Sequence, residues 1–339
     1  MPITLQDVAE KAGVSMKTVS RVVNKEKKVA EDTRTRVLQT IQELGYVPHI
    51  QAQRLASGRT RSIVLHFPLP NPELFSNLIG MDFITGVALG IAEEEYYFSL
   101  MTGPLTSGGL MKLCRGAQAD GLILMQIATQ DWRVEFLREN GFPFVMHGRC
   151  GNNDGLSFID LDFEHAMMEA YAHLTSLGHQ HIGFLTYPED WRVNGLGPAV
   201  RTWQGFKAAL KKFKVDSHYC ECQQTVERAY WATKSLLKED PGITAIVTIH
   251  NTQAVGAITA LQEMGRKVPD DCSIVGVMVG KESELIIPPL TSIEYSSHEI
   301  GHQVSAMLIR KIKGTRPGPE QILVLPELKL RRSTAPAPR

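Results

Sequence analysis

The sequence lacks the long apolar segments that secretion and membrane insertion require. Nowhere in its 339 residues do eighteen apolar residues run together. The first residues, MPITLQDVAEKAG, contain no apolar stretch of the kind found in a signal peptide. We therefore expect a cytoplasmic protein with no membrane partner.

Cysteine is also scarce. The five cysteines are scattered and odd in number, which indicates neither a disulfide framework nor a four-ligand zinc site. Asp160 and Asp162 alternate along the chain and could together hold a cation, but solvated residues are the simpler interpretation. The sequence therefore predicts no metal ion and no cofactor.

Signatures of catalysis are missing as well. The chain has no G-x-S-x-G, Walker loop, G-x-G-x-x-G or H-E-x-x-H pattern. The stretch SLLK at 235–238 fits the Ser-x-x-K pattern of acyl-enzyme hydrolases, but the S-D-N and K-T-G partners of that class are absent. We therefore expect no catalytic residues and no enzyme.

The chain does have enough apolar residues, 43% of the total, to bury more than one core, and its length suggests two or three domains. Its charge is divided unevenly. Residues 1–61 contain 11 Lys and Arg against 6 Asp and Glu, a net +5, whereas the remaining residues have 25 against 30, a net −5. A small basic module joined to an acidic body is expected if only the module contacts nucleic acid, although such an excess also suits an ordinary solvated surface.

The pattern within the basic module is typical of a helix-turn-helix. Thr4 can cap a first helix that ends at Gly13, and Ser15 can cap a second. A third helix is predicted over 31–44, before Gly45. The predicted inward faces consist of small or branched residues: Leu5, Val8, Ala9, Ala12, Val19, Val22, Val23, Val37, Ile41 and Leu44.

The second helix has the side chains of a recognition helix. With its valines inward, its first turns would present four side chains toward a major groove: Met16, Lys17, Ser20 and Arg21. Arg21 can bond guanine bidentately, Lys17 can donate to guanine acceptors, and Met16 can pack on a thymine methyl. Phosphate contacts would come from Ser15, Thr18 and Asn24. A structural helix pair with incidental polar residues is the alternative.

The stretch YVPHIQAQRLASGRT, residues 46–60, predicts a further helix that begins near Pro48 and ends at Gly58. A helix of about nine residues is unstable by itself in water, so it must fold against something. With TLQDVAEKAGVSMKTVSRVVN before it, this stretch resembles the LacI/GalR family of bacterial transcriptional repressors, and the resemblance extends over nearly the whole chain.

The resemblance implies a set of DNA contacts. In that family two hinge helices, one per protomer, order in the minor groove and insert paired leucines between base steps. Leu55 occupies the leucine position and Ala52 the small position against the groove, while His49 stands where the family commonly has Asn. The predicted DNA-binding residues are Thr4, Ser15, Met16, Lys17, Thr18, Ser20, Arg21, Asn24, His49, Ala52 and Leu55.

Beyond Thr60 the pattern changes to short apolar runs separated by helical stretches, which is typical of buried parallel strands. We predict an α/β core of two doubly wound lobes, periplasmic-binding-protein-like by the resemblance, preceded by the all-α headpiece. The resemblance also implies three crossings between lobes, placed near 159–163, 289–294 and 320–326. The predicted domains are a headpiece at 1–46, a hinge at 47–61, a two-lobed core at 62–332 and a flexible tail at 333–339.

Open α/β sheets bind ligands beyond the carboxyl ends of their strands, so we expect an effector in a cleft between the lobes. Arg201, in RTWQGFKAAL, matches a family arginine that forks onto ligand oxygens; a surface salt bridge is the alternative. Met278 stands where relatives have an acidic residue, which argues against a simple hexose, and Lys281 could favour an acidic or phosphorylated ligand. Trp191, Trp203 or Phe75 could stack on a ligand.

The complete predicted effector-binding set is Arg201, Lys281, His250, Gln224 and Phe75. For His250, a hydrogen-bonded histidine at a helix start is an equally good interpretation.

Two functions follow from these patterns. The first is a homodimeric repressor that binds double-stranded operator DNA and is controlled by a small-molecule effector, a carbohydrate or related metabolite. The second is a small-molecule binding protein or enzyme whose headpiece docks another protein. The predicted hinge favours the first, because a binding protein has no use for a marginal helix with an exposed leucine. No C-terminal heptad repeat is present, which favours dimers over tetramers.

Overall fold

The computed structural model describes residues 3–23, 28–46, 60–68, 78–116 and 118–338. The chain divides into two units, with the division after Arg61. The hinge helix expected over 47–61 falls on residues that lie almost entirely outside this description. Among the described residues, no helix combines the length and apolar character needed to cross a bilayer.

The first unit is the predicted helix-turn-helix headpiece. It consists of α1 (Leu5–Ala12), α2 (Met16–Val23) and α3 (Glu31–Leu44). Thr4 and Asp7 cap α1 reciprocally, since the N–H of Asp7 donates to Thr4 Oγ1 at 3.3 Å and the N–H of Thr4 donates to Asp7 Oδ2 at 2.7 Å. Gly13 ends α1 in the left-handed conformation, with φ of 65°. Ser15 Oγ accepts the N–H of Thr18 at 3.2 Å at the start of α2.

A small apolar core holds the three helices together. Its buried members are Val8, Ala9, Ala12, Val19, Val22, Val37 and Tyr46. Helical spacing predicted all of them except Tyr46. This residue follows Gly45, where the chain turns back and the N–H of Tyr46 donates to Ile41 O at 3.0 Å. The headpiece core is therefore closed by a residue beyond its last helix.

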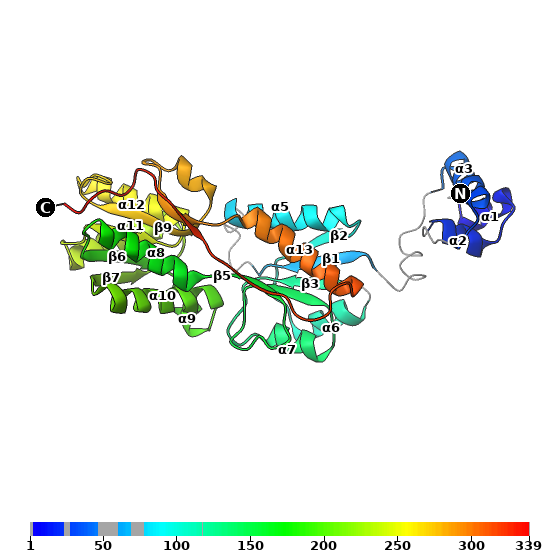
Figure 1. Cartoon of the computed structure of the whole chain (residues 1–339), viewed down its shortest axis with the longest axis horizontal. Coiled ribbons are helices and arrows are strands. Elements are labelled where there is room, and N and C mark those ends of the chain that lie inside the picture. Colours follow the sequence, from blue (N-terminus) through cyan, green and yellow to red (C-terminus); the bar gives the residue numbers. More distant parts are fainter. Residues whose placement is uncertain (1–2, 24–27, 47–59, 69–77, 117, 339) are drawn as a thin grey trace. The chain divides into compact units, whose positions relative to one another are not determined.

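The second unit contains two six-stranded sheets (Figure 1). The N-terminal lobe has strand order β11-β5-β4-β3-β1-β2, and the C-terminal lobe has β12-β10-β9-β8-β6-β7. Every pairing between these strands is parallel except that of β10 with β12. The strands are β1 (Ser62–His66), β2 (Tyr97–Met101), β3 (Gly121–Leu124), β4 (Phe144–His147), β5 (Phe158–Leu161), β6 (His181–Thr186), β7 (Asp216–Glu221), β8 (Ala245–Thr248), β9 (Ser273–Val279), β10 (Thr291–Glu294), β11 (Gln321–Val324) and β12 (Glu327–Lys329).

Helices cover both faces of each sheet, which confirms the doubly wound architecture. In the N-terminal lobe α5 and α13 cover one face and α6 and α7 the other; in the C-terminal lobe α8 and α10 cover one face and α11 and α12 the other. The elements are α5 (Leu78–Glu93), α6 (Ser107–Arg115), α7 (Trp132–Glu139), α8 (Phe163–Ser176), α9 (Glu189–Val193), α10 (Gly197–Phe213), α11 (Val226–Glu239), α12 (Asn251–Glu263), the 3-10 helix η2 (Lys281–Leu285) and α13 (Ser297–Lys313).

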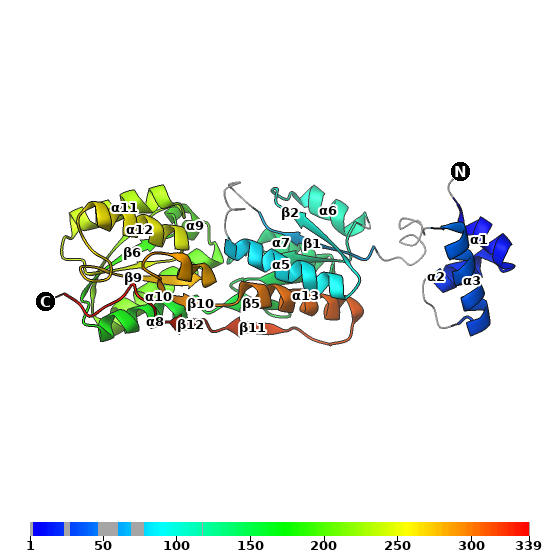
Figure 2. The ribbon, with the colours of Figure 1, turned by 90° about the horizontal axis from the view of Figure 1, so that it is seen from above.

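The chain passes between the lobes three times (Figure 2). The crossings follow β5, β10 and β11, at 161–163, 294–297 and 324–327. The second lies just after the predicted range of 289–294, because β10 occupies most of that range. Each lobe is therefore assembled from separate parts of the chain.

The C-terminal residues lie against the C-terminal lobe. Ser333 Oγ donates to Ile274 O at 2.6 Å, the N–H of Ala335 donates to Ser273 Oγ at 3.0 Å, and the N–H of Ala337 donates to Leu177 O at 2.8 Å. The prediction of a flexible tail from its proline-rich composition was therefore wrong for 333–338. These partners come from β9 and the end of α8, which local composition could not reveal.

Two glycines allow α5 and α13 to pack at close range. A Cβ atom on Gly86 would lie 2.0 Å from the carbonyl oxygen of His298, and one on Gly301 would lie 2.3 Å from that of Phe83. Backbone atoms cannot yield as a side chain can, so any larger residue at either position must push the helices apart.

We expect Gly301→Ala to destabilise the second unit by about 1 to 3 kcal/mol, because the added methyl overpacks the α5–α13 contact. Gly108→Ala is the control. It adds the same methyl to α6, where a Cβ has no atom within 4 Å, and should leave stability unchanged or raise it by up to about 1 kcal/mol. Urea denaturation measures both. Equal midpoints for Gly301→Ala and the wild type would contradict the close-packing argument.

Candidate functional site

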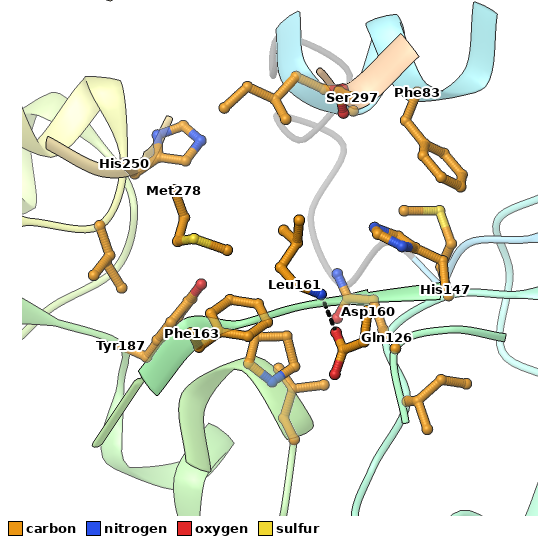
Figure 3. A pocket seen from close by; sticks show the side chains of 18 of the residues that line it. Phe83, Gln126, His147, Asp160, Leu161, Phe163, Tyr187, His250, Met278 and Ser297 are labelled. Atoms are coloured by element: carbon orange, nitrogen blue, oxygen red, sulfur yellow. Dashed lines mark hydrogen bonds between the residues drawn. The ribbon is translucent and has the colours of Figure 1, made fainter. Parts of the chain in front are cut away.

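A cavity of about 160 Å³ lies between the two lobes (Figure 3). It is bordered by residues that follow the strands of both sheets: Phe67 after β1, Gln126 after β3, Tyr187 after β6, Gln224 after β7 and His250 after β8. Doubly wound sheets bind ligands at these carboxyl ends of their strands. The cleft predicted from the strand pattern is therefore present at the predicted place.

Most of the cavity wall is apolar. The apolar and aromatic lining consists of Phe67, Ile79, Phe83, Met125, Ile127, Leu161, Phe163, Tyr187, Trp191, Leu196, Pro198, Ile249, Met278 and Tyr295, of which the two tyrosines also carry hydroxyl groups. Polar side chains are fewer: Gln126, His147, Asp160, Gln224, His250 and Ser297. No lysine or arginine lines the cavity in the described part of the chain. This composition suits a compact ligand with an apolar face and a few polar groups.

Asp160 supplies the cavity with its one carboxylate among the described residues. The side chain is buried, with 3% of its surface exposed, and burial raises its pKa. Its Oδ1 accepts the N–H of Leu161 at 2.9 Å, whereas its Oδ2 is buried and has no hydrogen-bond partner. The interpretation of Asp160 as a solvated residue was therefore wrong. Asp162, two residues on, instead caps α8 by accepting the N–H of His165 at 2.9 Å.

Arg201 lies behind Asp160 and joins the lobes. It extends from α10 of the C-terminal lobe, and its Nη2 donates to Arg149 O at 2.6 Å and to Cys150 O at 3.3 Å in the N-terminal lobe. Its Nη1 is 3.7 Å from Asp160 Oδ2 and makes no hydrogen bond. Only 5% of Arg201 is exposed, which excludes the surface salt bridge that was the alternative. The unsatisfied carboxylate oxygen of Asp160, which lines the cavity, can accept a ligand hydroxyl, whereas Arg201 does not line the cavity.

Backbone contacts close the same side of the cleft. The N–H of Thr129 donates to Gly195 O at 2.8 Å, and the N–H of Gly197 donates to Ile127 O at 2.9 Å. A Cβ at Gly197 would lie 2.3 Å from Arg201 Nη1, so glycine is required for the arginine to pass. The lobes are therefore in direct contact beside the cavity.

His250 begins α12 with its ring facing the cavity (Figure 3). Nδ1 accepts the N–H of Thr252 at 3.3 Å, so Nε2 of the neutral ring carries the proton. That Nε2 is buried and has no partner. Burial lowers the pKa of His250 to about 4, which keeps the ring neutral at physiological pH. The interpretation of His250 as a hydrogen-bonded histidine at a helix start is confirmed, while its contact with a ligand stays a prediction.

His147 is a cavity residue that the sequence analysis missed. It ends β4, stacks on Phe83 with ring centroids 4.6 Å apart, and is buried so that its pKa falls to about 4. Gln126 and Met278 were likewise not predicted as contacts, although both line the cavity in the left-handed conformation, with φ of 54° and 60°. Non-glycine residues in this conformation concentrate at functional sites.

The remaining predicted cavity residues lie in different places. Gln224 lines the cavity, whereas Lys281 is exposed at the start of η2 and does not. Trp191 lines the cavity and stacks on Tyr187, with ring centroids 5.7 Å apart. Trp203 is on α10 and does not line the cavity; its ring lies under the guanidinium of Arg192. The predicted contact Phe75 lies outside the described residues.

In the headpiece, α2 presents the predicted recognition face. Met16 is 53% exposed, which is unusual for a large apolar side chain on so small a module. Ser15 and Lys17 are also exposed, while Thr18, Ser20 and Arg21 are half-buried. The opposite side of α2 buries Val19 and Val22. Thr4 is exposed at the start of α1, and four predicted contacts lie outside the described residues: Asn24, His49, Ala52 and Leu55.

Comparison with known proteins identifies two family models in the chain. Residues 4–49 match the model described as bacterial regulatory proteins, lacI family. Residues 171–334 match the periplasmic binding protein-like domain. The chain is 30% identical to the HTH-type transcriptional regulator AglR of Rhizobium meliloti (strain 1021), an alignment that covers 100% of this chain and 96% of AglR.

Solved structures agree with this assignment. The lac repressor dimer bound to operator and the anti-inducer ONPF is 25% identical, with a TM-score of 0.84 over 99% of this chain and 100% of that one. The complex of the transcriptional regulator CelR with cellobiose is 27% identical, with a TM-score of 0.70 over 98% of this chain and 99% of that one.

The buried histidines predict a dependence of stability on pH. His66, His147 and His250 each have a pKa of about 4 in the folded protein, below the value near 6.5 of an unfolded chain. The contribution of these neutral histidines to the free energy of unfolding is complete above pH 6.5. It is lost as the pH falls toward 4, because the unfolded chain then binds more protons than the folded one. Each histidine can lower the free energy of unfolding by about 3 kcal/mol over this pH range. Denaturant titrations at pH 7.5, 6 and 5 should show this loss of stability, and His147→Gln should make the loss smaller. If the free energy of unfolding of this variant falls with pH as steeply as that of the wild type, His147 is not one of the histidines responsible.

Proposed function

Because the chain belongs to the LacI family, DNA-binding transcriptional regulators with an effector-binding domain, we propose that it is a repressor whose affinity for operator DNA is set by a small molecule bound between its lobes. It is a regulator rather than an enzyme. A repressor acts on the bacterial chromosome, so its proposed location is the cytoplasm. The observation that carries the proposal is the face of α2, where exposed Met16 and Lys17 stand beside Arg21.

The proposed DNA contacts divide by their chemistry. Arg21 and Lys17 read guanine, Met16 contacts thymine, and the hydroxyls of Ser15 and Thr18 bind phosphate. Ser20 completes the groove-facing set, and the capping residue Thr4 and Asn24 add contacts to the backbone of DNA. The likeness to a lac repressor dimer bound to operator supports a homodimer on a pseudo-palindromic site.

The proposed domain organisation assigns separate tasks along the chain. Residues 1–46 bind the major groove. Residues 47–61 form a hinge in which His49, Ala52 and Leu55 contact the minor groove. Residues 62–332 bind effector and form the dimer.

The proposed effector is an uncharged carbohydrate or related hydroxylated ring. The carboxylate of Asp160 accepts a ligand hydroxyl, His250 Nε2 donates to a ligand oxygen, and the amide of Gln224 can do either. Arg201 affects ligand binding indirectly, through its contact with Asp160 and with the backbone of the other lobe. Phe75 is proposed to stack on the ligand. An acidic or phosphorylated ligand is not favoured, because Lys281 is outside the cavity and both lining histidines are neutral. The likeness to CelR bound to cellobiose supports the carbohydrate class.

The switch follows from where these groups lie. Asp160 is on β5 of the N-terminal lobe, and His250 begins α12 of the C-terminal lobe. A ligand bonded to both stabilises one arrangement of the lobes over another. A difference of about 1 to 3 kcal/mol in ligand affinity between two arrangements gives a five- to 150-fold change in operator affinity.

We expect Arg21→Ala to cost about 1 to 3 kcal/mol in affinity for the operator and to relax the preference at one base pair in each half-site. Arg36→Ala, which removes the same charge from the exposed side of α3, should weaken all DNA binding slightly and keep the preference. Binding-site selection followed by fluorescence anisotropy measures both effects. The same consensus from Arg21→Ala and wild type would refute base reading by Arg21, and no preference for any duplex in the wild type would refute the repressor function.

We expect Arg201→Ala to abolish the effector response while operator affinity of the ligand-free protein stays nearly intact. Its loss removes one of the two guanidinium groups beside the Asp160 carboxylate, leaving only Arg149 at 3.6 Å, and removes the contact that joins the lobes beside the cavity, so we expect the ligand site to be lost with it. A thermal-shift screen of neutral sugars and sugar phosphates identifies the ligand, and calorimetry then measures its affinity for each variant.

Asp160→Asn keeps the shape of the site and should lower the affinity for the ligand at least tenfold. Lys281→Ala, at an exposed position outside the cavity, should bind the ligand with the affinity of the wild type. Ligand affinity that survives Arg201→Ala and Asp160→Asn would remove both residues from the site. Affinity that falls only in Lys281→Ala, or a response to phosphates alone, would overturn the proposal of an uncharged effector.

A further inference from the structure

A second group of ligating side chains lies in the C-terminal lobe, at the amino ends of the strands and so at the opposite end of the sheet from the cavity. His181 is the first residue of β6, Asp216 is the first residue of β7, and His218 follows on the same face of β7. Asp240 lies directly after α11. Strands β6 and β7 pair in parallel with His181 opposite Asp216, which brings the starts of both strands together.

The donor atoms of these residues converge. His181 Nδ1 lies 3.3 Å from Asp240 Oδ2 and 3.8 Å from Asp216 Oδ2, and all three atoms lie within 4.8 Å of one another. His218 Nε2 lies 3.8 Å from Asp216 Oδ1 and 3.9 Å from Asp240 Oδ2. Ligands about 2.1 Å from a tetrahedral ion are about 3.4 Å apart, so only small side-chain movements separate this arrangement from a coordination shell.

We propose that His181, Asp216, His218 and Asp240 bind a divalent transition-metal ion, of which Zn²⁺ is the best match. Two imidazoles and two carboxylates are ligands that Zn²⁺ takes in four-coordinate sites. Mg²⁺ and Ca²⁺ are poorer matches because they prefer an all-oxygen shell.

The surroundings of His218 support this assignment. While its Nε2 faces the two aspartates, its Nδ1 lies 3.6 Å from Glu239 Oε1. This distance is slightly longer than a hydrogen bond, but a histidine that binds a metal usually donates its other nitrogen to a carboxylate, and Glu239 is placed to accept such a bond after a small side-chain movement. Glu239 is therefore assigned as the orienting residue and not as a ligand.

The charges around the site also favour a cation. Three carboxylates, those of Asp216, Glu239 and Asp240, lie around two imidazoles, and within the described parts of the chain none of them pairs with a lysine or arginine. A divalent ion would neutralise the two ligand carboxylates and fasten the end of α11 to the starts of β6 and β7.

This site is independent of the effector cavity. The cavity lies beyond the other ends of the same strands, and the six residues of β6 extend over roughly 17 Å. The sequence analysis predicted no metal site because the ligands are far apart in the chain and show no metal-binding spacing. Parallel pairing of β6 and β7 and the end of α11 create the site only in the folded lobe.

The test uses the full-length protein, freed of metal with a chelator and titrated with Co²⁺. Wild type should bind Co²⁺ with the visible absorption of a tetrahedral site, Zn²⁺ should displace it, and the ion should raise the melting temperature of the second unit. The double variant H181Q/H218Q should bind Co²⁺ at least tenfold more weakly and lose both the absorption and the thermal shift. Equal melting temperatures of the two proteins in chelator establish that the variant is folded.

His302→Gln is the matched control. This histidine is on α13, has the same side-chain exposure of 36% as His218, and faces a single carboxylate, that of Glu93 at 2.9 Å. It should leave Co²⁺ binding and the thermal shift unchanged. Absence of metal-dependent absorption in the wild type, or equal binding by the wild type and H181Q/H218Q, would overturn the proposal. Neither result affects the repressor function, because none of these residues lines the cavity.

Discussion

The buried contact between Arg201 and Asp160 is the constraint on which the second unit depends. A guanidinium from one lobe enters the other, where it bonds two backbone carbonyls and faces a carboxylate that burial would otherwise neutralise. Burial opposes the charge on both partners, and each keeps one polar atom unsatisfied. A buried pair of this kind contributes little net stability, but breaking it by removing one partner is expensive. Its value lies in specifying one arrangement of the lobes and in leaving one carboxylate oxygen of Asp160 ready for a ligand.

Local patterns predicted the fold well. The spacing of Val19 and Val22, the caps at Thr4 and Ser15 and the glycine at 13 each act over a few residues, so the headpiece could be derived before its coordinates were known. Continuous apolar runs predicted the central strands of both sheets for the same reason. The contacts of residues 333–338 could not be predicted, because their partners on β9 and α8 are more than fifty residues away.

The cavity was harder to predict than the fold that surrounds it. Gln224 and His250 were placed at the cavity through resemblance to relatives, and the strand ends indicated where they would meet. Arg201, predicted on the same ground, lies behind Asp160 and outside the cavity lining. His147 and Gln126 gave no signal, since a histidine at the end of a strand and a glutamine after one are unremarkable in a sequence. Asp160 was misjudged because two alternating acidic residues resemble a solvated segment, and only the folded lobes reveal that one of them is buried.

The triple passage of the chain between lobes has a consequence for synthesis on the ribosome. The headpiece is contained in residues 4–46 and can fold as soon as it emerges. The N-terminal lobe cannot, because α13 and β11, supplied by residues 297–324, cover α5 and complete the sheet edge beside β5. Until those residues are translated, the glycine-rich face of α5 and the edge of β5 are exposed. A nascent chain therefore acquires its DNA-reading module long before it acquires the part that can be regulated.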